Sequence, residues 1–442
     1  MGLSWCFRAV RGRALNAFDQ KLAKNTVGKT VGNEANVISC IVYFDELPEL
    51  DAVEDTCRRG LLSVDTFTSR PIRGTWQRVE EVDLKQHLIE HTVNGEDELH
   101  AFAEGIMMRP LRSANNLSAP LWEIFLVTNK GPGRSGFVAR IDHSLGDGIA
   151  LTHVLARIAT TTAGAPLPLP IYKRPTPPAK DWFAMLVAIF KAIGKYLLLP
   201  AVGWDSDTPC NAPLRTRHNG LTFNNRRRTI FIPEHSLEQI KRIKTKAGKM
   251  FTVNDVVFAA TAGALRKYCE TQGANLNDAN ARALVPVAFP RKTDTPSGNL
   301  WTFLSVRLPI ERPTLSQRLA LSHSLFDELK ASGEPVISNM LAQLNLGAPD
   351  FVFGKVGQSI FSRHTMVFSN VPGPSEPVCI GGRRVIGIQA LYPNLITQMI
   401  CISYCDRMFM NFVVDEDVFT APDLLPKLYL DELEALDALP PA

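Results

Sequence analysis

The chain has 442 residues, of which 45% are hydrophobic and 21% are charged, and these proportions exclude a disordered, collagen-like or coiled-coil protein. A chain of this length exceeds one compact core, so two domains are expected. The 48 Lys and Arg residues against 44 Asp and Glu residues give a net charge of +4, which argues against a nucleic-acid-binding protein. The eight cysteines form no CxxC pair, a pattern typical of reduced thiols.

Residues 1–34 form a basic N-terminal arm. Cys6 stands where a myristoylation motif requires Ser or Thr, and no apolar run of the length of a secretory signal follows. We expect the arm either to fray or to lie on a membrane as a basic amphipathic segment, with an organelle transit peptide as a further alternative.

Residues 35–162 are predicted to form a first α/β domain. Apolar runs indicate strands over Ala35–Phe44, Leu121–Thr128 and Ser135–Asp142. Helical periodicity follows from Ile149 to Ile158. The order of strand, sharp turn and helix is typical of an α/β arrangement.

Residues 163–218 are predicted to be a linker, because six prolines lie between Ala163 and Lys180. The apolar segment 182–204 that follows has nearly the length that spans a bilayer. However, Lys191 and Lys195 lie in its middle, and Gly194 and Pro200 interrupt it. We therefore interpret it as a helix in the membrane interface, with a helix packed between domains or a true span as alternatives.

Residues 219–442 are predicted to form a second α/β domain. Helices are expected over Glu234–Lys246, Asn254–Tyr268 and Asp423–Ala438. Strands are expected over Arg227–Pro233, Ala283–Phe289, Trp301–Pro309, Thr365–Phe368 and Val385–Leu391, with a hairpin across Gln398–Val414.

The sequence Ile141–Gly148 (IDHSLGDG) carries an HxxxDG pattern between a predicted strand and a predicted helix. The imidazole of His143 suits a general base that takes a proton from a hydroxyl group. Asp147 can hold the turn by accepting a buried hydrogen bond or by pairing with an arginine. Gly146 and Gly148 permit a bend and the close approach of a substrate.

His87 and His91 match a competing HxxEH zinc pattern, in which two histidines four residues apart share a helix face. No third ligand is identifiable, and Thr92–Gly95 would end the helix, so a zinc hydrolase is the weaker interpretation.

From about Val37 to Ala435 the chain resembles the wax ester synthase/diacylglycerol acyltransferase family of bacteria and plants. The resemblance rests on several motifs in order: Pro120-Leu121-Trp122, Asp142–Gly148 against HHxxxDG, Asn254-Asp255, Gly298-Asn299, and Ser369–Pro374 (SNVPGP). The pattern HHxxxDG alone is shared with other acyltransferases, whereas the combination is specific. This chain departs from it at Asp142, which replaces the first histidine.

The resemblance implies two α/β domains of the CoA-dependent acyltransferase type, each a mixed sheet flanked by helices, with the active-site channel between them. It implies direct transfer from acyl-CoA to a fatty alcohol or diacylglycerol, with His143 as the base, Asp147 beside it, and no cofactor or metal. Asn254 is the first candidate for stabilising the oxyanion, with Ser369 or Asn370 behind it. Asp255 is expected to cap its helix or to brace the site. For the Asn254-Asp255 pair, the alternative is a purely structural role as the N-cap of a helix.

Two basic clusters could attract CoA or an anionic membrane, although solvated surface is the default interpretation; they comprise Arg226–Arg228, and Lys241, Arg242, Lys244, Lys246 and Lys249. A membrane-associated protein on the cytosolic face of the endoplasmic reticulum or a lipid droplet is expected, with targeting to the plasma membrane or an organelle as the alternative.

Two other functions stay open. One is acyl transfer to another alcohol or a phenolic acceptor, as in plant transferases that carry a DFGWG block. Asp350–Gly354 (DFVFG) matches that block only in part. The other is an inactive lipid-binding protein, which the replacement at Asp142 makes conceivable.

Overall fold

The computed structural model describes residues 13–33, 36–168, 190, 203–211, 223–289, 298–331, 338 and 346–441. The first twelve residues of the basic arm lie outside this part of the chain. The predicted interfacial segment 182–204 also lies outside it, except for Phe190, Gly203 and Trp204. Among the described residues, no helix combines the length and hydrophobicity that crossing a bilayer requires.

The first domain is built on a mixed sheet with the strand order β5-β6-β7-β2-β14-β13-β8 within the described residues. Strands β5 and β6 are parallel, and the other neighbours in this sheet are antiparallel. The strands are β2 (Val37–Phe44), β5 (Leu88–Val93), β6 (Trp122–Asn129), β7 (Ser135–Asp142), β8 (Thr160–Thr161), β13 (Val378–Ile380) and β14 (Arg383–Leu391). A small sheet of β1 (Arg13–Ala14), β4 (Thr75–Arg78) and β3 (Ser69–Ile72) lies beside it.

The second domain is built on a mixed sheet with the strand order β11-β10-β12-β15-β16-β9 within the described residues. The pairs β10–β12 and β12–β15 are parallel, and the rest are antiparallel. The strands are β9 (Arg227–Ser236), β10 (Arg282–Ala288), β11 (Trp301–Arg307), β12 (Met366–Pro372), β15 (Gln398–Tyr404) and β16 (Arg407–Asp415).

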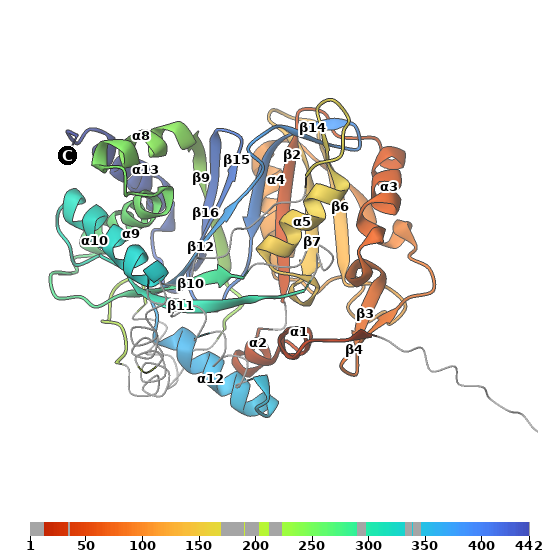
Figure 1. Ribbon diagram of the computed structural model, residues 1–442, viewed down its shortest axis with the longest axis horizontal. Coiled ribbons are helices and arrows are strands. Elements are labelled where there is room, and N and C mark those ends of the chain that lie inside the picture. The colour runs from red at the N-terminus through yellow and green to blue at the C-terminus, as the bar shows by residue number, and fades with distance from the viewer. Residues whose placement is uncertain are drawn as a thin grey trace, which may run out of the picture.

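Helices flank the two sheets, as Figure 1 shows, so the predicted two-domain α/β fold is confirmed. Helices α8, α9, α10 and α13 lie over the second sheet, and α3 and α5 lie on the side of the first. Their bounds are α3 (Leu50–Arg59), α4 (Glu96–Met107), α5 (Gly148–Ile158), α8 (Leu237–Ala247), α9 (Val253–Thr271), α10 (Leu315–Ala331) and α13 (Leu425–Asp437).

The domains in space are not the two halves of the chain that the sequence analysis separated at 163–218. Strands β13 and β14 come from the second half, yet β14 pairs along its length with β2 of the first sheet. The chain then returns to the second sheet through β15. The chain therefore passes between the two sheets three times, from β8 to β9, from β12 to β13 and from β14 to β15, which limits how far the domains can separate.

The end of the basic arm is folded rather than frayed. Asn16 caps helix α1 (Ala17–Ala23) by accepting a hydrogen bond from the backbone of Asp19, and α2 (Thr26–Val31) follows. Both lie beside α12 (Asp350–Ser362) at the lower edge of the view in Figure 1. Glycine permits a close approach of α2 to α12, since a Cβ at Gly354 would lie 2.1 Å from Oγ1 of Thr30.

Most predicted elements are confirmed with bounds that shift by a few residues, and Ser135–Asp142 forms β7 with the predicted limits. The helix expected to begin at Glu234 instead begins at Leu237. The reason is tertiary: β9 continues to Ser236 because Ser236 pairs with Arg407 of β16. The side chain of Ser236 then caps α8.

The HxxEH segment is not helical. Leu88–Val93 forms β5, which pairs in parallel with β6, and residues four apart on a strand are about 13 Å apart at roughly 3.3 Å per residue. His87 instead bonds the backbone oxygen of Trp122 at 2.6 Å, and His91 stacks on Phe102. Within the described residues, no group of three or more His, Cys, Asp or Glu side chains could hold a metal ion.

Candidate active site

The HxxxDG sequence forms the sharp turn between β7 and α5. Strand β7 ends at Asp142, a short 3-10 helix covers His143–Leu145, and α5 begins at Gly148. The backbone N–H of His143 donates to the carbonyl oxygen of Asn36 at 2.9 Å. The turn therefore carries the imidazole of His143 away from the end of the sheet toward the second domain.

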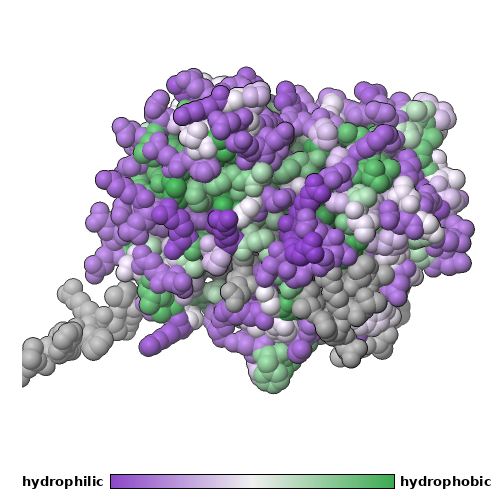
Figure 2. All heavy atoms as spheres, turned by 180° about the vertical axis from the view of Figure 1, so that it is seen from behind, coloured by the Kyte–Doolittle hydropathy of each residue, from purple (hydrophilic) through white to green (hydrophobic). Residues whose placement is uncertain are grey.

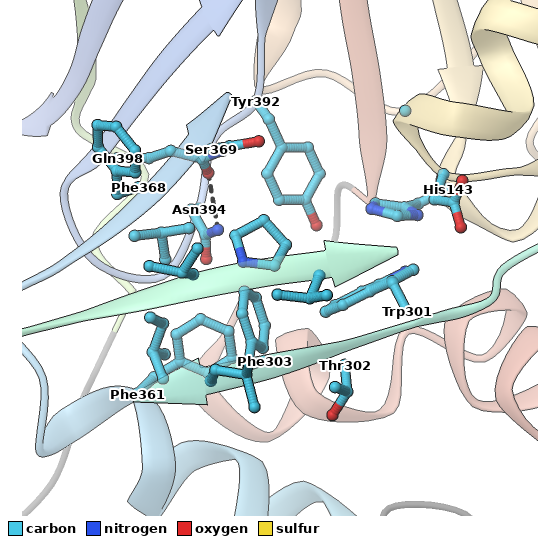
Figure 3. A pocket seen from close by; sticks show the side chains of 18 of the residues that line it. His143, Trp301, Thr302, Phe303, Phe361, Phe368, Ser369, Tyr392, Asn394 and Gln398 are labelled. Atoms are coloured by element: carbon cyan, nitrogen blue, oxygen red, sulfur yellow. Dashed lines mark hydrogen bonds between the residues drawn. The ribbon is translucent and has the colours of Figure 1, made fainter. Parts of the chain in front are cut away.

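His143 projects into a cavity between Trp301 and Tyr392, as Figure 3 shows. Its Nδ1 atom lies 3.1 Å from Oδ1 of Asn299, and its ring centre is 5.5 Å from that of Tyr392. Burial lowers the pKa of His143 below its ordinary value of 6.5, against the opposing effects of its own backbone oxygen, Asp147 and Asn299. The imidazole is therefore neutral at neutral pH, as a general base must be.

Asp147 holds the turn together by accepting hydrogen bonds from two backbone N–H groups. Its Oδ1 accepts the N–H of Ala150 and so caps α5, while its Oδ2 accepts the N–H of Leu300 across the domain boundary, each at 2.9 Å. The backbone of Gly298 also bonds the turn, since its N–H donates to Leu145 and its oxygen accepts from Asp147. Asp147 thus ties the strand end that carries Asn299 to the loop that carries His143.

The two glycines of the motif are required for close packing. A Cβ at Gly146 would lie 2.7 Å from Cβ of Ala150, and one at Gly148 would lie 3.2 Å from Cγ2 of Val371. Gly146 is extended, with φ 168°, a conformation open to any residue. The limit at this position is therefore space and not backbone strain.

Asp142, which departs from the family pattern, bonds within its own turn. Its Oδ1 accepts from the backbone N–H of Ser144 at 2.9 Å and from the hydroxyl of Ser144 at 2.6 Å. Burial raises the pKa of Asp142 to about 6, against the lowering effects of these bonds and of the positive charge of Arg70. Asp142 braces the turn, and it titrates close to neutral pH.

The candidate oxyanion residues divide into two groups. Asn254, Ser369 and Asn370 all line the cavity, and Nδ2 of Asn370 donates to Oδ1 of Asn254 at 2.7 Å. This bond leaves the amide hydrogens of Asn254 for other partners. Asp255 is fully buried, forms a capping box with Thr252 and lies 3.0 Å from Nδ1 of His323, so it braces α9 and is not an oxyanion donor.

The cavity has a volume of about 930 Å³ and extends from His143 into the second domain. Phe18 and Leu22 of α1 contribute to its wall beside β10, β11, α10 and α12. Figure 3 shows Phe303, Phe361 and Phe368 on the side away from His143, together with the bonded pair Asn394 and Gln398. Its mainly apolar lining includes Leu284, Phe303, Phe326, Leu329, Phe361 and Phe368.

Four residues around His143 have no role that the sequence motifs predict: Asp19, Asn36, Asn299 and Tyr392. Asn299 was part of a noted motif, Gly298-Asn299, which was the available signal. The hydroxyl of Tyr392 donates to Oδ1 of Asn36 at 2.9 Å. No local pattern distinguishes Asp19, Asn36 or Tyr392, because each reaches the site from a distant part of the chain.

The two basic clusters are largely neutralised by acids. Arg227 is buried and bonds Asp415, and Arg226 and Arg228 pair with Asp417 and Asp423. In the second cluster Lys241 pairs with Glu238, and Arg242 and Lys246 both pair with Asp437. The result favours the interpretation as structural and solvated surface over an anion-binding site.

Two family models match the chain. The wax ester synthase/diacylglycerol acyltransferase catalytic domain matches residues 49–257, and the WS/DGAT C-terminal domain matches residues 297–437. A putative diacylglycerol O-acyltransferase of Mycobacterium tuberculosis is 27% identical over 335 residues. That match covers 70% of this chain and 64%, slightly less than two thirds, of the relative. A probable diacylglycerol O-acyltransferase of the same organism is 24% identical over 392 residues, covering 82% and 81% of the two chains.

Solved structures show the same fold. The wax ester synthase/diacylglycerol acyltransferase from Marinobacter aquaeolei VT8 superposes with a TM-score of 0.63 at 20% identity, covering 96% of this chain and 98% of that one. The first condensation domain of the calcium-dependent antibiotic synthetase gives a TM-score of 0.63 at 15% identity, covering 98% and 97%. At these identities the likeness extends to architecture alone.

Proposed function

Because the chain belongs to the wax ester synthase/diacylglycerol acyltransferase family, we propose that it transfers a long-chain acyl group from acyl-CoA to the hydroxyl of a fatty alcohol, a diacylglycerol, or both. The observation that carries the proposal is the position of His143. Its Nδ1 atom is occupied by Asn299, and its ring projects into an apolar cavity of about 930 Å³. Such a cavity suits two substrates whose bulk is hydrocarbon.

The reaction requires one proton movement and one displacement. Nε2 of His143 takes the proton of the acceptor hydroxyl as its oxygen attacks the thioester carbon. A C–O bond forms, the tetrahedral intermediate collapses, the C–S bond breaks, and the thiolate of CoA takes up the proton from His143. Acyl-CoA is a substrate, and this sequence of steps needs no cofactor or metal.

Asn254 is our candidate for stabilising the oxyanion. Its Oδ1 accepts from Asn370, which orients its Nδ2 hydrogens away from Asn370, and Asn254 lines the same cavity as His143. A donor prepositioned where negative charge develops lowers the barrier most in a site that excludes water.

An acceptor panel tests the function. Purified protein with palmitoyl-CoA is offered hexadecanol, dioleoylglycerol, a short alcohol and a phenolic alcohol, and release of free thiol is followed. Ester formation with hexadecanol or dioleoylglycerol is expected. Turnover with only the short or phenolic acceptor would support the alternative acceptor class. Binding of lipid without turnover of any acceptor would support the inactive lipid-binding alternative.

The pH profile of kcat/KM should report a base with a lowered pKa. Only neutral His143 can take the proton, and a pKa below 6.5 keeps it neutral over a wider range. We expect the profile to stay flat from roughly pH 8 to below pH 6.5 and to fall at lower pH. The Asp142→Asn variant is the control, because Asp142 has a pKa of about 6. If kcat/KM of this variant no longer falls at low pH, the titration of Asp142 and not that of His143 causes the fall in wild type.

We also propose that the protein works at a membrane surface, on the cytosolic face of the endoplasmic reticulum or on a lipid droplet. The apolar segment 182–204 supports this proposal, as do the exposed side chains of Phe190 and Phe351. Figure 2 shows apolar atoms among hydrophilic ones on one face, including a group that projects at its lower edge.

Deletion of residues 183–199 is the test of membrane association. We expect the deletion variant to move from the membrane pellet to the soluble fraction, because the apolar face that inserts into the interface is removed. The full chain serves as the control in the same fractionation, and unchanged pelleting of the variant would refute the proposal.

A further inference from the structure

The side-chain amide of Asn299 links His143 to an aspartate at the other end of the chain. Asn299 is 4% exposed and lies just before β11. Its Nδ2 donates to Oδ1 of Asp19 at 3.0 Å and to the backbone oxygen of His143 at 2.7 Å. Its Oδ1 lies 3.1 Å from Nδ1 of His143.

The partners of Asn299 determine which way its amide faces. A carboxylate and a backbone oxygen only accept hydrogen bonds, so the Nδ2 group must lie on their side. On the other side, the indole Nε1–H of Trp301 lies 3.3 Å from Oδ1 of Asn299. An indole N–H only donates, so it requires the oxygen there.

With the amide oriented in this way, the protonation of the imidazole follows. Oδ1 of Asn299 has no hydrogen to give, so Nδ1 of His143 must carry the proton when the ring is neutral. The lone pair is then on Nε2, where it can take a proton from the acceptor hydroxyl. The opposite tautomer would present Nε2–H to the substrate and would be inactive as a base.

Asp19 secures the far side of this arrangement. It is 3% exposed on α1, and its Oδ1 accepts both the backbone N–H and the Nδ2 of Asn299, each at 3.0 Å. Its Oδ2 accepts from Nδ2 of Asn16 at 2.7 Å, and its backbone N–H donates to Oδ1 of Asn16. The carboxylate is therefore itself held in place at the start of the helix.

We propose that Asp19 and Asn299 are positioning residues that keep His143 in the tautomer with its proton on Nδ1. Helix α1 of the basic arm then positions the catalytic histidine through Asp19, in addition to forming part of the cavity wall. The effect on turnover rests on the proposed function. The tautomer itself is a property of the free protein.

Nitrogen NMR of protein labelled at histidine tests the tautomer without any substrate. In wild type at pH 7.5 the Nδ1 of His143 should be protonated and its Nε2 should carry the lone pair, with the signal assigned by its absence in His143→Gln. In Asp19→Ala the amide of Asn299 loses one of the acceptors that orient it, and Asn299→Leu removes the amide entirely. Both variants should shift population toward Nε2–H.

Kinetics then test the consequence. Asp19→Ala and Asn299→Leu should lower kcat at least about tenfold while KM for acyl-CoA stays within about threefold, since a wrong tautomer impairs proton transfer and not binding. Asp19→Asn retains an acceptor oxygen and should recover more activity than Asp19→Ala. If Asp19→Ala does not fold, Asp19→Asn is the variant to measure. Lys24→Met, at the C-cap of the same helix and with its side chain 58% exposed, is the matched control and should match wild type in both measurements.

An unchanged tautomer in Asp19→Ala and Asn299→Leu would overturn the proposal, as would Asp19→Asn being as impaired as Asp19→Ala. A wild-type protein that turns over no acceptor but shows the expected tautomer shift would refute the proposed function while supporting the positioning roles. The two hypotheses are therefore tested separately.

Discussion

Replacing His143 with alanine is expected to lower kcat by about 10²–10⁴-fold, the range that general-base catalysis contributes. The variant loses the group that takes the proton of the acceptor hydroxyl, while the cavity wall and the turn remain. The KM for acyl-CoA should change little, because an effect confined to the transition state appears in kcat. Steady-state assays with palmitoyl-CoA and the best acceptor of the panel measure both constants.

His91→Ala is the matched control for this experiment. His91 is exposed on β5, stacks on Phe102 and does not line the cavity, so its replacement should leave kcat within about twofold of wild type. If His143→Ala retained the turnover of wild type, the proposed mechanism would be wrong.

Replacing Asp147 with alanine should destabilise the protein by about 1.5–5 kcal/mol. The loss of the N-cap of α5 costs about 0.5–2 kcal/mol, and the N–H of Leu300 loses its acceptor in a partly buried position, a further cost of about 1–3 kcal/mol. We also expect kcat to fall by about 100-fold, because the freed strand end carries Asn299, the hydrogen-bond partner of His143. Urea unfolding measures the stability, and the same assays measure kcat.

Ser236→Ala is the control for Asp147→Ala, because it removes a helix N-cap without breaking a hydrogen bond between the domains. Ser236 caps α8 through a bond to the N–H of Glu238 and lies far from the motif in the chain, so its loss should cost about 1 kcal/mol and leave kcat unchanged. If Asp147→Ala lost no more stability than Ser236→Ala and kept its turnover, the role of Asp147 in joining the domains would be refuted.

Local patterns in the sequence predicted the strands and helices well where hydrophobic periodicity decides the structure. Ser135–Asp142 and the helix that follows it are examples, since their burial is set by residues close in the chain. The HxxEH segment is helical only in the weaker zinc interpretation, and the structure excludes that interpretation because pairing with β6 makes the segment a strand. The division of domains by chain position differed from the structure for the same reason, as β14 pairs with β2 from more than 300 residues away.

The sequence by itself determined the family, the two-domain α/β fold and the motif that places His143 at a strand end, because these depend on local patterns in a set order. Only the tertiary structure decided what surrounds the imidazole. Asp19 and Asn299 are 280 positions apart, and no spacing rule relates them. They meet because α1 packs beside the turn that Asp147 ties to the second domain. The histidine was visible as a residue in a motif, whereas the hydrogen bonds that determine which of its nitrogens is the base exist only in the folded chain.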